Sequence, residues 1–336
     1  AAGVARYTPC PEGVAQAEIR AGRRIGARLL LFGDPDYPPR LAAIPGAPIA
    51  LWALGDLSLG LRPAVAVVGS RNASSLGLRA ARRLARELGE AGVVVVSGLA
   101  RGIDTAAHEC ALATGTIAVH AGGVDHIYPP ENSSLAAEIG RTGLRLSEHP
   151  PGHTPQARHF AQRNRLVAGL ADAVLVVEAR AQSGSLITAS IALDLGKEVL
   201  AVPASPLDPR SEGCNRLIRD GATLVRHAGD VLEVLGSTRL PPRVPRPDAP
   251  EAAGEHRSMP PGAAAQGSGG QEGTPGTQKP DLAARLLSLL GAGGADLDQL
   301  SRDAGRPMAE VAATVSRLEI EGRVRRDAGG RLIRLD

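Results

Sequence analysis

The sequence predicts an α/β domain with a parallel, doubly wound sheet, followed by a small winged-helix domain. Three observations support this prediction. Short apolar runs rich in valine recur between residues 64 and 225, and stretches with helical spacing separate them. Strands that helices cover on both faces need such uniformly apolar runs. Beyond residue 280, three short helical patterns precede a hairpin pattern, which is the order of elements in a winged helix.

Seven apolar runs are the predicted strands. Between the first two, apolar residues from Leu78 to Leu88 follow helical spacing, and Gly92 can end that helix. Further helices are expected at residues 103–114 and 185–195, a pattern typical of repeated βαβ units. The predicted strands are residues 64–69, 93–98, 116–123, 144–148, 173–179, 198–204 and 222–225.

Composition divides the chain into four parts. Residues 1–62 are expected to be a strand-like lead-in that packs on the α/β domain of residues 63–236, and the missing initiator Met suggests a start inside a longer protein. Residues 237–280 are crowded with Pro, Gly, Ala and Ser, so we expect a disordered linker. Residues 281–336 hold the winged helix, with its hairpin turning at Gly329–Gly330, and the linker makes it a separate unit.

Composition also excludes some classes of protein. No run of about 18 apolar residues could span a membrane, and no signal peptide is recognisable, so we expect a cytoplasmic protein. Cys10, Cys110 and Cys214 lie too far apart for a disulfide framework or a zinc site. Lys197 and Lys279 are the only lysines, so arginine, which suits phosphate, supplies nearly every positive charge. A net charge of +3 does not by itself establish nucleic-acid binding.

Three turns that follow predicted strands could each hold an anion, because a helix start presents free backbone N–H groups. Since the carboxyl ends of parallel strands share one edge of a sheet, we expect the turns to converge. Arg71 stands where a dinucleotide site would need a second glycine, which favours an exposed phosphate chain; the alternative is a structural turn with a solvated arginine. The candidate binding residues in these turns are Gly69, Ser70, Arg71, Gly98, Arg101, Gly184, Ser185 and Thr188.

Residues 158–165 place one of the two phenylalanines, Phe160, among cationic and amide side chains. An aromatic ring beside guanidinium groups is typical of single-strand binders, in which each stacked base contributes about 1–3 kcal/mol. The alternative is that Phe160 fills the core. The candidate contacts here are Arg158, Phe160, Arg163, Asn164 and Arg165.

The chain lacks the common catalytic motifs, including GxSxG and HExxH, so we expect no catalytic residue and no cofactor. His149, His153 and His159 have spacings that could hold a metal, but no cysteine or carboxylate pair beyond Glu148 is close in the sequence, so we expect no metal site. Asp104 is expected to cap its helix. His108, on the same helix, is expected to be a packed or surface histidine rather than a catalytic base.

Seven segments follow one another along the chain: GSR…SSLG, VVSGLARGIDTAAH, AGGVDHIYPPEN, SEHPPG, RNRLVAGLADAVLVVEA, SGSLITA and EGCNRLI. In order and spacing they resemble the DprA/Smf family over residues 30–226, and the terminal winged helix is also similar. The resemblance implies a Rossmann-like protein that binds and protects incoming single-stranded DNA. It further implies a homodimer that loads RecA recombinase onto DNA coated by single-strand binding protein during natural transformation and recombination.

The resemblance also implies roles for particular residues. It assigns phosphate binding to Gly69, Ser70 and Arg71, base stacking to Phe160, and polar contacts to Asn164, Gly184, Ser185 and Thr188. Some relatives carry a lysine shortly before the aromatic residue, and Arg158 is its candidate replacement here. The family's N-terminal helical domain is absent or reduced to residues 1–28.

Two alternatives remain open at this stage. The predicted recognition helix of the winged helix, Met308–Glu321, carries Glu310, Glu319 and Glu321 against a single arginine, so DNA would meet the arginine-rich wing, or the domain contacts protein. The competing function is a nucleotide-binding or nucleoside-monophosphate-hydrolysing enzyme with a Rossmann-like fold. Such an enzyme would need a PGGxGT-like loop, which this chain lacks.

Overall fold

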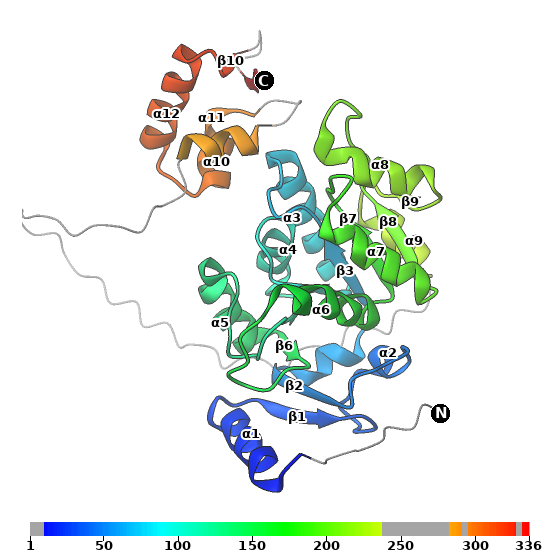
Figure 1. Cartoon of the computed structure of the whole chain (residues 1–336). Coiled ribbons are helices and arrows are strands. Elements are labelled where there is room, and N and C mark those ends of the chain that lie inside the picture. Colours follow the sequence, from blue (N-terminus) through cyan, green and yellow to red (C-terminus); the bar gives the residue numbers. More distant parts are fainter. Residues whose placement is uncertain (1–9, 237–281, 291–294, 327–330, 336) are drawn as a thin grey trace, which may run out of the picture.

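The computed structural model describes residues 10–236, 282–290, 295–326 and 331–335. The linker predicted at residues 237–280 and the hairpin turn predicted at Gly329–Gly330 lie outside these ranges. The described residues form a layered α/β domain and a small domain of three helices and two strands (Figure 1).

The large sheet, within the described residues, has nine strands in the order β1-β2-β6-β5-β4-β3-β7-β8-β9. Strands β3 to β9 pair only in parallel with one another, whereas β1 pairs with β2 and β2 with β6 in antiparallel fashion. The chain winds outward from β3 in both directions, which confirms the predicted doubly wound sheet. The strands are β1 Arg28–Leu31, β2 Ala50–Gly55, β3 Ala64–Val68, β4 Val94–Ser97, β5 Thr116–Val119, β6 Leu144–Ser147, β7 Ala173–Val176, β8 Glu198–Ala201 and β9 Thr223–Leu224.

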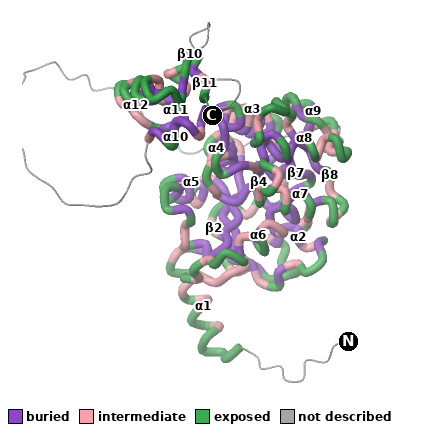
Figure 2. Tube along the Cα trace, turned by 45° about the horizontal axis from the view of Figure 1, so that its top comes forward, coloured by how far each residue is buried: buried purple, intermediate pink, exposed green. Residues whose placement is uncertain are grey.

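Helices cover both faces of this sheet, and the alternation of side chains along β3 shows how. Val65 and Val67 pack in one buried cluster with the apolar face of α3, whereas Ala66 and Val68 pack in a second cluster with α6 and α7. Both faces of the strand are therefore dry, as the uniformly apolar runs predict. The neighbouring strands β4 and β7 are likewise buried (Figure 2). The helices are α1 Glu12–Arg24, α2 Pro39–Ala42, α3 Ser75–Glu90, α4 Ile103–Ala111, α5 Ser133–Thr142, α6 Ala157–Leu170, α7 Gly184–Asp194, α8 Glu212–Arg219 and α9 Ala228–Val234.

The segment before β3 extends the sheet through β1 and β2. Sequence reasoning predicted a strand-like lead-in but missed helix α1. Gly22 of α1 lies against the ring of Trp52 in β2 so closely that an added Cβ would stand 2.0 Å from a ring carbon. A glycine at this helix position therefore permits the close packing of α1 on the end of the sheet.

The C-terminal domain has the predicted winged-helix elements: α10 Leu282–Leu289, α11 Leu297–Ala304, α12 Met308–Ile320, β10 Val324–Arg326 and β11 Leu332–Arg334. It contacts the α/β domain in this structure, and its independent motion stays a prediction. The buried carboxylate of Asp303 pairs with Arg82 of α3 at 3.0 Å. The guanidinium of Arg210 donates to the carbonyls of Ser288 and Leu290 at 2.6 and 3.0 Å. Charged groups and backbone carbonyls thus join the two domains.

The three cysteines Cys10, Cys110 and Cys214 are free thiols, as their spacing predicts. Among the described helices, none is both long and apolar enough to cross a membrane.

Candidate nucleic-acid interface

Three turns meet at one edge of the sheet, because β4, β3 and β7 are neighbours and run in parallel. The turns are residues 69–74 after β3, 98–102 after β4 and 177–183 after β7, and we refer to them as the turn cluster. The amide of Ser70 donates to the carbonyl of Glu178 at 2.7 Å, and the amide of Ile103 donates to the carbonyl of Ser70 at 3.2 Å. The predicted convergence is therefore confirmed.

A glycine is required where two of these turns touch. Gly102 has a positive φ of 75°, and an added Cβ would lie 2.3 Å from the carbonyl oxygen of Ser70. It is also the N-cap residue of α4. Any side chain at this position would push the first two turns of the cluster apart.

Arg71 and Phe160 form the exposed centre of the candidate interface. Arg71 stands out from the first turn, and its guanidinium carbon lies 5.6 Å from the centroid of the Phe160 ring. The edge of Tyr128 approaches the same ring, with centroids 5.3 Å apart and an angle of 61° between the planes. Phe160 is partly exposed between these two side chains, which does not fit the alternative of a core filler. Sequence reasoning missed Tyr128, although it is one of only three tyrosines and lies in the segment AGGVDHIYPPEN.

The polar candidates on α6 and α7 lie next to this centre. Asn164, one helical turn after Phe160, donates to the carbonyl of Gly184 at 3.5 Å, so the start of α7 lies beside α6. Ser183 is the N-cap residue of α7 and accepts the amide of Ser185. Ser185 and Thr188 are buried, whereas Gly184 is exposed. The structure therefore brings these residues together, with Gly184 presenting its backbone to solvent.

Arg163 faces the protein interior, which corrects its prediction as a contact to phosphate. It is buried, and one nitrogen of its guanidinium donates to the carbonyls of Gly98 and Val119 at 2.5 and 2.6 Å. Burial lowers the pKa of Arg163 to about 10. An added Cβ on Gly98 would lie 2.3 Å from this guanidinium, so Gly98 makes room for it. Arg163 thus ties α6 to the ends of β4 and β5.

Arg165 is likewise engaged within the protein. Its guanidinium reaches both carboxylate oxygens of Glu148 at 2.5 Å and the carbonyl of Gly46 at 2.8 Å. These partners engage part of the guanidinium, and the Arg165 side chain is partly exposed, so its contact with phosphate stays a prediction. By contrast Arg158 is exposed, with its Nε 3.3 Å from Nε2 of His159.

A groove between the two domains continues from Arg71. Exposed Arg101 also lines it and forms an ion pair with Glu131. The winged helix contributes two arginines, one from α10 and one from α11, to the lining of this groove. The charged residues that line the groove are Arg71, Arg82, Arg101, Glu109, Glu131, Arg285, Arg302 and Asp303.

Glu178 holds the first turn of the cluster, a role that sequence reasoning missed. Its carboxylate accepts the amide of Ser74 at 3.1 and 3.2 Å and the Ser74 hydroxyl at 2.5 Å. That hydroxyl oxygen in turn accepts the amide of Gly77 and so caps α3. Burial raises the pKa of Glu178. The carboxylate at the end of β7 therefore fixes the turn that presents Arg71.

Asp104 does not cap its helix in the predicted way, because Gly102 occupies the N-cap position. The buried Asp104 carboxylate instead accepts the amides of Gly98 and Ala100 at 3.1 and 3.3 Å, and burial raises its pKa. His108 is fully buried, with Nδ1 2.7 Å from the Thr116 hydroxyl. This confirms His108 as a packed histidine, and burial lowers its pKa to about 3.

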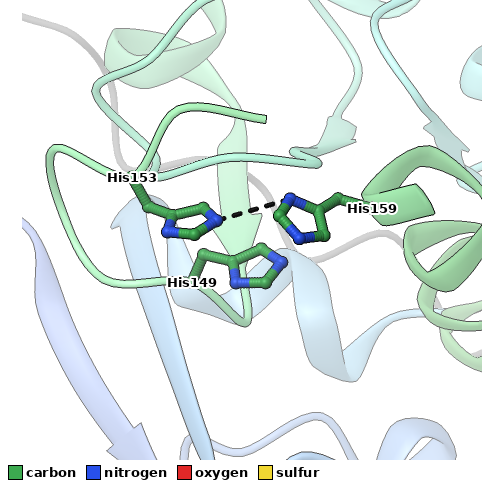
Figure 3. Close-up of side chains that lie close together, drawn as sticks. All are labelled: His149, His153 and His159. Atoms are coloured by element: carbon green, nitrogen blue, oxygen red, sulfur yellow. Dashed lines mark hydrogen bonds between the residues drawn. The ribbon is translucent and has the colours of Figure 1, made fainter. Parts of the chain in front are cut away.

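Three histidines come together beside the start of α6 (Figure 3). The ring centroids of His149 and His153 are 4.3 Å apart. The ring centroid of His159 lies 4.7 Å from that of His149 and 4.9 Å from that of His153. The spacing of these residues in the sequence did not show that the segment between β6 and α6 folds back on the helix.

Comparison with known proteins identifies the family. A family model described as DNA recombination-mediator protein A matches residues 28–236, and one described as the DprA winged helix domain matches residues 271–330. The chain belongs to the DNA recombination-mediator protein A family. The resemblance to the DprA/Smf family that the sequence motifs indicate is thereby confirmed, as is the Rossmann-like fold with a winged helix. A role in DNA processing and recombination follows from this membership.

Individual relatives agree with the family assignment. The chain is 48% identical over 201 residues to the DNA processing protein DprA of Streptococcus pneumoniae, covering 59% of this chain and 71% of that protein. It is 37% identical over 300 residues to protein Smf of Escherichia coli, covering 88% of this chain and 74% of Smf. Both matches extend over most of the relative's length.

Two solved structures of family members have the same fold. The X-ray structure of the Streptococcus pneumoniae protein superposes with a TM-score of 0.62 at 42% identity, covering 67% of this chain and 78% of that one. The Helicobacter pylori protein, described as having a unique single-stranded DNA binding mode, superposes with a TM-score of 0.58 at 31% identity. That match covers 63% of this chain and 97% of the Helicobacter pylori chain.

Proposed function

We propose that this chain binds single-stranded DNA at the turn cluster, with Phe160 stacking on a base and Arg71 neutralising a phosphate. The observation that carries the proposal is the position of the Arg71 guanidinium over the partly exposed Phe160 ring. A ring can stack only on a base that is free of its duplex neighbours, and base stacking on aromatic residues is the usual mode of single-strand binders. The single-stranded DNA binding mode described for the Helicobacter pylori relative supports the proposal.

The proposed path of the strand follows the helix starts. A phosphate would lie at the turn of Gly69, Ser70 and Arg71, where the N-terminus of α3 favours an anion. The next base would meet Phe160, with Tyr128 at its edge. Further along, the exposed backbone of Gly184 at the start of α7 would contact the strand, beside Asn164. Ser185 and Thr188 would support this contact from inside, and exposed Arg101 and Arg158 would flank the path.

Fluorescence anisotropy with labelled oligonucleotides tests the binding mode. We expect single-stranded DNA to bind far more tightly than a duplex of the same sequence, and the affinity to fall with salt, because phosphate contacts release counterions. Equal affinity for the two forms would overturn the proposal, since stacking on Phe160 would then have no part in binding.

We further propose that the protein acts in the cytoplasm as a homodimer that protects incoming single-stranded DNA and loads RecA recombinase onto it during natural transformation. Membership of a recombination-mediator family supports this. The test is RecA-dependent strand exchange on DNA coated by single-strand binding protein, with nuclease protection and light scattering measured on the same sample. We expect the chain to accelerate exchange. No acceleration despite tight single-strand binding would contradict the loading role alone.

We propose that the protein is not an enzyme. Two buried carboxylates, Glu178 in the turn cluster and Asp104 beside it at the start of α4, already have structural partners. Glu178 accepts hydrogen bonds from Ser74, and Asp104 accepts the amides of Gly98 and Ala100. An enzyme that hydrolyses nucleoside monophosphates would need a carboxylate free to act on its substrate. Release of free base from nucleoside monophosphates, detected by chromatography, would replace this proposal with the enzymatic alternative.

A further inference from the structure

The three clustered histidines come from different parts of one segment. His149 is the second residue after the end of β6. His153 lies in the connection between β6 and α6, and His159 lies in the first turn of α6. One ring nitrogen of each residue lies within 4.8 Å of a ring nitrogen of the other two. His153 and His159 approach most closely, with Nε2 of the first 3.4 Å from Nδ1 of the second (Figure 3).

Three imidazoles at this separation are close to the geometry of a metal site. Imidazole nitrogen suits zinc, cobalt, nickel and copper ions. A tetrahedral zinc ion binds nitrogen at about 2.0–2.1 Å, which places two such ligands roughly 3.3 Å apart. Nitrogens within 4.8 Å of one another therefore need to move by only about 1 Å each. Rotation of the partly exposed His149 and His153 side chains can provide such a movement.

We propose that His149, His153 and His159 form a binding site for a divalent transition metal ion, with the fourth position left to water. The site goes beyond the proposed binding of DNA and does not depend on it. Three protein ligands with one open position are a common arrangement for zinc.

The surrounding groups leave the three imidazoles as the ligands. Both carboxylate oxygens of Glu148 are bound to Arg165, and those of Asp125 accept the amide of Gly152. Nδ1 of His159 accepts the amide of Gln156 at 3.1 Å, so the lone pair of this nitrogen points at that amide, and Nε2 of His153 lies 3.4 Å from the same nitrogen. A metal ion would compete with that amide for the lone pair. Arg158 lies on the other side of the His159 ring, at Nε2.

A metal ion at this site would fasten the segment 149–156 to the start of α6. Without a metal ion, the segment is held by the amide of Gly123, which donates to the carbonyl of His153 at 2.9 Å. His159 directly precedes Phe160, and Pro155 lies with Phe160 in the wall of one narrow pocket. The ion would therefore restrict the motion of the backbone that carries the aromatic residue.

The test uses the full chain, purified without a polyhistidine tag and stripped of metal with a chelator, and it uses metal ions alone. We expect the visible absorption of Co²⁺ to titrate to one ion per chain, with the band intensity of a four- or five-coordinate complex, and Zn²⁺ to displace it. The melting temperature should rise with the concentration of Zn²⁺, because the ion binds only the folded form tightly. Absence of saturable uptake would overturn the proposal, whatever the outcome of the DNA experiments.

Matched variants locate the site. Loss of a residue that only hydrogen-bonds to a metal ligand weakens metal affinity roughly 10- to 100-fold. His153→Ala and His149→Ala remove a ligand itself, so each should weaken metal affinity by more than that. His227→Ala, which removes an exposed histidine next to α9, is the control and should leave the titration unchanged. Circular dichroism without metal verifies that each variant folds.

Zn²⁺ should slow amide hydrogen exchange in residues 149–156 of the parent chain but not of His153→Ala. Undiminished uptake by His153→Ala would place the ion elsewhere and overturn the site.

Discussion

The guanidinium carbon of Arg71 lies 5.6 Å from the centroid of the Phe160 ring, although Arg71 belongs to the turn after β3 and Phe160 to helix α6. A cation over an exposed aromatic ring is worth about 0.5–1 kcal/mol. A hydrogen bond between a charged group and its partner contributes more, about 1.5–3 kcal/mol. An arriving phosphate can therefore draw Arg71 off the ring and leave the ring free for a base. In the absence of DNA, Arg71 covers the stacking surface that DNA would use.

Replacing Phe160 with alanine tests the stacking surface. Phe160→Ala should weaken binding of single-stranded DNA by about 1–3 kcal/mol, the value of one stacked base. The melting temperature should change little, because the ring is partly exposed and its contacts with Arg71 and Tyr128 lie at the surface. Anisotropy titration and thermal unfolding of the same sample measure both effects.

The only other phenylalanine provides the matched control. Phe32 is 55% exposed after β1 and contacts Tyr37, far from the turn cluster in the sheet order. Phe32→Ala should leave the affinity for DNA unchanged. Truncation of a fully buried phenylalanine costs about 3–5 kcal/mol of stability. A stability loss of that size in Phe160→Ala, with normal affinity in the folded fraction, would assign the ring to the core.

Arg71→Ala should weaken single-strand binding without sequence preference. Because the variant neutralises one phosphate fewer, the slope of log affinity against log salt should become shallower by about 0.7. Titrations at several salt concentrations measure this slope. Arg219→Ala is the control, since Arg219 is an exposed arginine on α8 that pairs with its neighbour Asp220. If the slope stays the same in Arg71→Ala, Arg71 does not meet phosphate.

Glu178 should matter for both stability and binding. Glu178→Ala leaves the buried amide and hydroxyl of Ser74 without their acceptor, which should cost about 1–3 kcal/mol of unfolding free energy. The loosened turn should also weaken DNA binding through Arg71. Glu178→Gln retains an oxygen acceptor, so we expect a smaller loss of both. Urea unfolding and anisotropy compare the two variants, and equal losses in Ala and Gln would show that the charge, not the hydrogen bonds, holds the turn.

Two buried histidines should make stability depend on pH. Burial lowers the pKa of His108 and of His120 to about 3 each in the folded protein. In the unfolded chain a histidine has a pKa of about 6.5. Between these values the unfolded state binds more protons, so stability is lost as the pH falls below about 6.5, by up to roughly 1.4 kcal/mol per pH unit for each histidine.

The substitution His108→Asn isolates one of the two contributions. Urea unfolding between about pH 5 and 7, a range that includes the pKa of an unfolded histidine, measures the unfolding free energy. Its slope against pH should be smaller for this variant than for the parent chain. His120→Asn should reduce the slope in the same way, because burial lowers the pKa of that histidine as well. An unchanged slope in a folded His108→Asn would mean that His108 is protonated in the native state.

The sequence was sufficient to predict the seven parallel strands of the sheet and the position of the turn cluster, but not the antiparallel pairing of β1 and β2. Valine-rich runs define strands buried on both faces, and the carboxyl ends of parallel strands must share an edge, so the meeting of Ser70 with Glu178 and Ile103 follows from pattern and topology. Helix α1 was missed because its contact depends on Gly22 and Trp52, which lie on separate elements. Such a contact leaves no periodic signal in the sequence.

The directions of individual side chains could not be predicted in the same way. Arg163 and Asn164 both lie about one helical turn after Phe160, and only the packing of α6 decides that Arg163 points inward. Glu178 and Ser74 are 104 residues apart, so their hydrogen bonds depend on the completed fold. The histidine cluster depends on the path of residues 148–156, which no periodicity specifies.

Removal of all residues after Gly236 tests how the two domains share the DNA. Most of the single-strand affinity should remain, because Arg71, Phe160 and the three turns lie in the α/β domain. The salt slope should nevertheless become shallower by about 0.7 for each phosphate that is no longer neutralised, since Arg285 and Arg302 line the groove that continues from Arg71. The melting temperature must be measured as well, because the truncation removes the buried partner of Arg82.

A full-length double variant separates loss of charge from loss of the domain. Arg285→Ala with Arg302→Ala keeps the Asp303–Arg82 ion pair and the carbonyl partners of Arg210, so the winged helix should stay in contact with α3. Its salt slope should match that of the truncated chain, because both lack the same two guanidinium groups. If truncation lowers the slope but the double variant does not, other cationic residues after Gly236 supply the phosphate contacts instead. If neither lowers it, the strand leaves the turn cluster by another route, and the winged helix takes no part in single-strand binding.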